Sequence, residues 1–98
     1  MSRKSQTDEA LRRSQEEAWT GDAVLGLFAR EWILHEHRKL DGPMSQRFTS
    51  NQFLACFGNP TEVEARIGRI YRERGLQAAF DWIEEELLPL FLKQEKNR

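Results

Sequence analysis

Cysteine and long apolar runs are nearly absent from this chain. Cys56 is the only cysteine, and a lone thiol can form neither an internal disulfide nor a metal site by itself. No apolar run approaches the ~20 residues needed to cross a bilayer, and no signal peptide is recognisable. We therefore expect a cytoplasmic protein with no membrane-spanning segment.

An excess of positive charge is also missing. The 98 residues carry 15 Lys and Arg against 16 Asp and Glu, a net charge of −1. Domains that hold nucleic acid by charge alone usually carry an excess of cations. Any binding of a polyanion must therefore come from a local basic patch or from a bound metal ion.

No strand pattern or repeat is present, and the apolar spacing predicts an all-α fold of three or four packed helices. Capping residues, prolines and glycines place the boundaries: Asp8, Ser50 and Asn59-Pro60 as starts, Gly58 and Gly75 as stops, and Pro89 as a bend. The expected helices are 9–37, 51–57, 60–74 and one from 76, and 37–46 is expected to be a turn-rich connection. We predict one domain at 8–93, a disordered N-terminus at 1–7 and a solvated tail at 94–98.

Two acidic residues lie where a plain helical bundle would not place them. Asp22 opens the apolar run of the first helix, and Glu64 lies beside the apolar stripe of the third. Glycine inside a helix costs ~1 kcal/mol relative to alanine, and close approach of another backbone is a frequent reason to keep it. Gly21 and Gly26 on one helix and Gly68 on the other predict a tight crossing that brings the two acids together.

Two carboxylates at close range cannot both ionise without compensation. One of them takes a proton, or arginines such as Arg30, Arg66 or Arg69 pair with them, or a divalent cation bridges them. Magnesium suits the last case because it binds through one or two carboxylates and keeps several waters. Spacing alone leaves these alternatives open.

Two segments resemble the ribonuclease III family. The stretch 17–27, EAWTGDAVLGL, resembles the family's signature helix, approximately LEFLGDAVLGL. The stretch 63–71, VEARIGRIY, followed by GLQAA at 75–79, is similar to the family's FEALIGAIYLDGGLEAA. The two motifs occur in the family's order, each with its acid, and together with the short helix between them they cover most of residues 15–92.

The departures from the full pattern point to one branch of the family. Gln15, Ala18 and Thr61 occupy positions where the full pattern has acids. The changes at Ala18 and Thr61 are similar to those of Mini-ribonuclease III, a compact branch that lacks the double-stranded-RNA-binding domain and keeps only the acids matching Asp22 and Glu64. The segment after Leu34 is shorter here than in that branch.

The resemblance implies a metal-dependent endoribonuclease. Asp22 and Glu64 would be both the catalytic residues and the ligands of Mg²⁺ or Mn²⁺. The substrate implied is double-stranded or structured RNA rather than DNA, with products ending in 5′-phosphate and 3′-hydroxyl. The alternative is a catalytically degenerate ribonuclease III-type homodimer that binds RNA or protein, favoured by the near-neutral charge and the missing acids.

Weaker signals concern partners. Arg66 and Arg69 lie largely away from the apolar stripe of their helix, and Arg38 and Arg47 belong to a second basic cluster; all four are candidates for contacts with RNA phosphates. The family works as a homodimer through its signature helices. Trp19 and Phe28 offer apolar surface for such an interface, although an ordinary monomeric core is the alternative for both.

Overall fold

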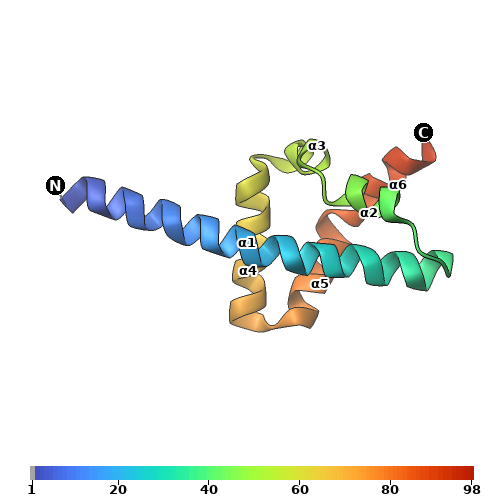
Figure 1. Cartoon of the computed structure of the whole chain (residues 1–98), viewed down its shortest axis with the longest axis horizontal. Helices are drawn as coiled ribbons and strands as arrows, with labels where there is room; N and C mark the ends of the chain where they lie inside the picture. The colour runs from blue at the N-terminus through green and yellow to red at the C-terminus, as the bar shows by residue number, and fades with distance from the viewer. Residues whose placement is uncertain (1) are drawn as a thin grey trace.

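A computed structural model of the chain describes residues 2–98, with side chains from Asp8 onward. The predicted all-α fold is confirmed, and residues 2–98 contain no strand (Figure 1). The elements are α1 (Ser2–His37), α2 (Gly42–Phe48), α3 (Asn51–Leu54), the 3-10 turn η1 (Ala55–Phe57), α4 (Pro60–Arg74), α5 (Leu76–Glu86) and α6 (Leu88–Lys96). None of the helices in this part of the chain is both long and apolar enough to span a membrane.

The arrangement is organised around α1. Helix α4 crosses α1, and the contact between these two helices is the most extensive in the molecule. Helix α5 packs beside α4 (Figure 1). Helices α2, α3 and α6 lie on the C-terminal side of this crossing, whereas the N-terminal turns of α1 project away from the body as an arm. The molecule is consequently elongated, with extents of 53 × 27 × 21 Å.

The first helix begins earlier than expected. Helix α1 starts at Ser2, so residues 2–7, which we expected to be disordered, form its first turns, and Asp8 is not an N-cap. Residues 2–20 contain no glycine or proline that would interrupt the helix. The arm gains little from packing, because the side chains from Asp8 to Gln15 are exposed apart from half-buried Ser14.

Helix α2 was missed in the sequence. The Asp41-Gly42-Pro43 triplet, expected to be a turn, is instead a helix start. The Asp41 carboxylate accepts a hydrogen bond of 3.0 Å from the backbone N–H of Met44, and Pro43 occupies the first turn, where its missing N–H costs nothing.

The other local signals are confirmed. Ser50 caps α3 by accepting from the Phe53 N–H, and Asn59 caps α4 by accepting from the Glu62 N–H. Gly58 and Gly75 follow the ends of η1 and α4 with φ of 133° and 94°, a region that favours glycine. The expected bend near Pro89 is a break at Leu87 between α5 and α6.

The C-terminal stretch 94–98, expected to be a solvated tail, is exposed except for half-buried Glu95, but it is more ordered than expected. Helix α6 continues to Lys96. Two hydrogen bonds of 2.8 and 2.9 Å join the Arg47 guanidinium to the Glu95 carboxylate, tying the end of α6 to α2. Pairing between partners so distant in sequence is set by tertiary packing, which local patterns do not contain.

The core draws apolar side chains from every helix. Its largest members include Leu25, Phe28, Phe48, Phe53, Leu54, Ile67, Ile83, Leu87 and Phe91. Phe48 and Phe91 meet edge to face at a centroid distance of 4.6 Å, which joins α2 to α6. We had predicted that Phe28 contributes to a dimer interface. Phe28 instead belongs to this core and is 6% exposed, so its ring is not available to a partner subunit.

The tight crossing predicted from the glycines occurs between α1 and α4. A Cβ at Gly21 would overlap the carbonyl oxygen of Glu64 and lie 2.9 Å from the backbone nitrogen of Gly68. A Cβ at Gly68 would overlap the carbonyl oxygen of Glu17. Gly26 is not part of the crossing, since a Cβ there would meet nothing within 4 Å. The two helix backbones therefore touch because each helix presents a glycine to the other.

We predict that Gly21→Ala destabilises the protein by about 3 kcal/mol or more, because the obstructing atoms are backbone and cannot move without separating the helices. Gly26→Ala is the matched control and should be stabilising by about 0.5–1 kcal/mol, since alanine favours the helix and the space is open. Urea unfolding of both variants tests this. Equal effects of the two substitutions would contradict the crossing.

Candidate active site

The crossing brings together the two acids that the sequence singled out. Asp22 follows Gly21 on α1, and Glu64 supplies the carbonyl oxygen that Gly21 touches on α4. The side chains of Asp22 and Glu64 lie within hydrogen-bonding distance of each other. Asp22 is exposed and Glu64 is half-buried, so the pair opens toward solvent at the edge of the core.

This contact changes the acidity of Glu64. Burial, the hydrogen bond with Asp22 and the negative charge of Asp22, in that order, raise the pKa of Glu64 from 4.5 to about 7. A hydrogen bond between two carboxyl groups requires a proton on one of them. Near neutral pH the pair is thus poised between one shared proton and two negative charges, as expected for carboxylates held together without a cation.

The structure does not show the arginine pairing that we considered for these acids. The Arg69 guanidinium donates instead to Glu17, at 3.3 Å, and Arg66 stacks over the Trp82 ring at 5.9 Å from its centroid. No ion pair between residues 8 and 98 includes Asp22 or Glu64. Their mutual repulsion is therefore not relieved by a neighbouring basic side chain.

The donor set suits a hard divalent cation with a mostly aqueous shell. Carboxylate oxygens are the ligands that Mg²⁺ prefers, and one or two of them suffice when waters fill the remaining positions. No group of three or more His, Cys, Asp or Glu side chains in the described part of the chain could enclose a metal ion. Asp22 and Glu64 therefore match an open two-carboxylate site and not a closed structural one.

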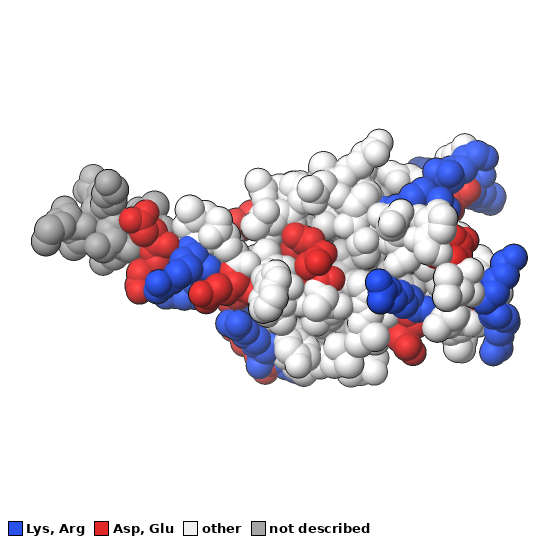
Figure 2. All heavy atoms as spheres, viewed as in Figure 1, with Lys and Arg blue, Asp and Glu red and all other residues white. Residues whose placement is uncertain are grey.

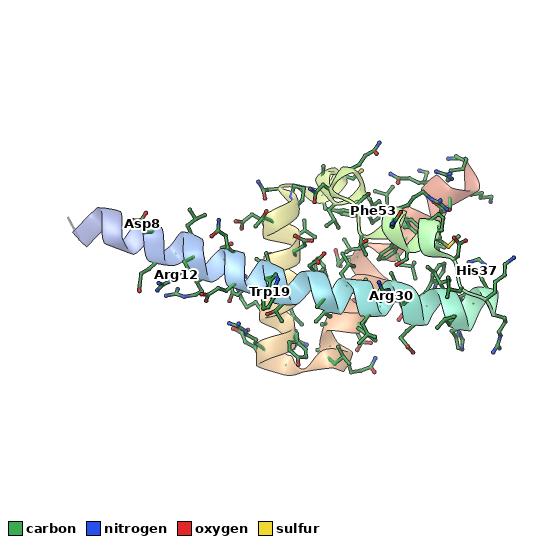
Figure 3. The ribbon with its side chains drawn as sticks, in the orientation of Figure 1. Asp8, Arg12, Trp19, Arg30, His37 and Phe53 are labelled. Atoms are coloured by element: carbon green, nitrogen blue, oxygen red, sulfur yellow. The ribbon has the colours of Figure 1, made fainter. Side chains whose placement is uncertain are left out.

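A hollow of about 500 Å³ adjoins Asp22 between α1 and α2. Its lining residues are Asp22, Ala23, Gly26, Leu27 and Arg30 of α1, Ser45 and Gln46 of α2, and Thr49. We call this the α1–α2 groove. Helix α1 lies in front of α4 and α5 in Figure 3, with Trp19 and Arg30 labelled along it.

The four arginines predicted to contact RNA are separated from this groove. Arg66 and Arg69 line a different hollow, with Trp82, and Arg69 is held by Glu17. Arg47 is bound by Glu95. Arg38 is exposed just past the end of α1, where its φ of 60° ends the helix.

Two features of this region were missed in the sequence. Glu17 is the one buried acid among the described side chains, 9% exposed and paired with Arg69. The α1–α2 groove was also missed, because α2 itself was not predicted. Trp19, in contrast, was singled out, and it is 82% exposed.

The surface over α1 carries few charges. Figure 2 shows an acidic patch near the middle of this face, isolated basic side chains nearer the C-terminal end, and mixed charges on the projecting arm.

Comparison with known protein families, with curated proteins and with solved structures finds no match to this chain. What the site can do is therefore judged from its own side chains.

Proposed function

We propose that this protein is a metal-dependent endoribonuclease of the ribonuclease III type, acting on double-stranded or structured RNA. The observation that carries the proposal is the contact between Asp22 and Glu64 at the Gly21–Gly68 crossing. All four residues are among those that the two resembling motifs share with the family pattern. A carboxylate pair that no basic side chain neutralises must either share a proton or bind a cation, and a cation is favoured once both groups are ionised.

Asp22 and Glu64 would hold Mg²⁺ or Mn²⁺ through one oxygen each, with water completing the shell. When bound, such an ion supplies an acidified water and offsets the negative charge that develops on the phosphate. The contribution of the chain is positional: the backbone contact at Gly21 and Gly68 sets how closely the two helices that carry the carboxylates approach. Hydrolysis would leave 5′-phosphate and 3′-hydroxyl ends.

A second candidate function is a catalytically degenerate homodimer that binds RNA or protein without cutting. The family pattern has acids at the positions of Gln15, Ala18 and Thr61. None of these residues supplies a carboxylate, and Ala18 is buried. The site therefore has only two acidic ligands, the minimum used by the compact branch that the chain resembles. Cleavage assays separate the two candidates.

We also propose that the protein is a homodimer through the surface of α1 around Trp19, on the N-terminal side of the α1–α2 groove. Trp19 is 82% exposed, and an indole ring of ~150–250 Å² in water is unfavourable for a monomer. Of the two residues predicted for the dimer interface, Trp19 is at the surface and Phe28 is buried.

We predict that the protein cuts double-stranded RNA only with Mg²⁺ or Mn²⁺ present, and that Asp22→Asn or Glu64→Gln lowers the rate at least about 100-fold, because each removes half of the acidic ligands. Glu62→Gln is the matched control on α4 and should retain activity. Denaturing gels of end-labelled RNA, with a duplex DNA of the same sequence that should remain intact, provide the measurement. Binding without cutting would favour the second candidate, and neither would exclude both.

We predict that Trp19→Ala weakens self-association by about 30-fold in Kd, the ~2 kcal/mol typical of a buried interface tryptophan. Leu40→Ala is a suitable control, because Leu40 is 83% exposed but lies beyond the end of α1. Sedimentation velocity over a concentration series measures both. A wild-type protein that stays monomeric at high micromolar concentration would contradict the homodimer.

A further inference from the structure

The α1–α2 groove has a composition suited to a phosphate-bearing strand. Asp22 lies at one end and Arg30 is eight residues further along α1, about 12 Å at 1.5 Å per residue. Eight residues are just over two helical turns, so both side chains project from neighbouring sides of α1. Apart from Asp22, no acidic side chain lines the groove.

Arg30 differs from the other arginines near the core. Arg47 and Arg69 are bound by Glu95 and Glu17, and Arg66 lies over Trp82. Arg30 is exposed, and it forms no ion pair or side-chain hydrogen bond with any side chain from Asp8 onward. Its five N–H donors are therefore free to bind a phosphate.

Helix α2 provides polar groups on the opposite side of the groove. Ser45 and Thr49 are half-buried, and Gln46 is exposed. The Thr49 hydroxyl donates to the backbone carbonyl of Ser45 at 3.0 Å, so its oxygen keeps acceptor capacity. Hydroxyl and amide groups of this kind bind the phosphate and sugar oxygens of nucleic acids, and the 2′-hydroxyl of RNA can both donate and accept.

We propose that the α1–α2 groove binds the RNA strand next to the phosphate that is cut, with Arg30 contacting a backbone phosphate and Gln46 and Ser45 hydrogen-bonding the strand. This proposal rests on the proposed nuclease function, because it takes the cut to be at Asp22 and Glu64. Arg30 is a positioning residue: at about 12 Å from Asp22 along the helix it lies beyond the reacting phosphate. Its contribution is to register and affinity.

The test compares Arg30→Gln with Arg13→Gln, an equal change of charge at an exposed position on the α1 arm. In the otherwise unaltered protein, Arg30→Gln should raise KM for double-stranded RNA about tenfold with little change in kcat, because the contact is made equally in the ground and transition states. Arg30→Lys should recover part of the lost affinity, since lysine restores the positive charge but cannot bind a phosphate in a bidentate manner. Arg13→Gln should leave KM unchanged.

A binding measurement separates failure of this proposal from failure of the nuclease function. In the Glu64→Gln background, anisotropy of a labelled RNA duplex should show about tenfold weaker binding on adding Arg30→Gln. The slope of log Kd against log salt should fall by about one. If Arg30→Gln and Arg13→Gln behave alike in KM, affinity and salt dependence, the groove proposal is overturned even where the wild type cuts RNA. Absence of cutting with the binding difference intact overturns only the nuclease.

Discussion

The contact of two backbones at Gly21 and Gly68 is the constraint on which the rest of the structure depends. It places α4 across α1 at a distance that any side chain would prevent. The same contact holds Asp22 and Glu64 near each other, because Asp22 follows Gly21 and the carbonyl oxygen of Glu64 faces Gly21. Helix packing and the candidate chemistry therefore share one cause.

That arrangement carries a cost in stability. With its pKa raised from 4.5 to about 7, Glu64 ionises less readily in the folded state than in the unfolded chain. The folded state therefore loses stability as the pH rises through this range, and the loss is complete above about pH 7. A cation bound by both carboxylates would reverse the effect, since it stabilises the ionised pair. Retaining such a pair makes sense at a functional site and not in a core built only for packing.

Local signals predicted the helix boundaries at Ser50, at Asn59-Pro60 and at Gly75, since a cap or a positive φ is decided by adjacent residues. Two glycines and two acids also predicted the crossing and its carboxylate pair. Helix α2 was missed because Asp41-Gly42-Pro43 is compatible with both a turn and a capped helix start. Phe28 was misplaced because an apolar helix surface does not indicate which side faces the core. The groove at Arg30 required α2 to be in position first.

The pKa of Glu64 tests the central contact most directly. NMR titration of its side-chain carboxyl carbon, in metal-free buffer with EDTA, should give a pKa near 7 in the wild type. In Asp22→Asn that pKa should fall toward, but not reach, its ordinary value, because the charge of Asp22 is lost while partial burial remains. A wild-type pKa near 4.5, or one that Asp22→Asn leaves unchanged, would show that the two carboxyl groups do not meet.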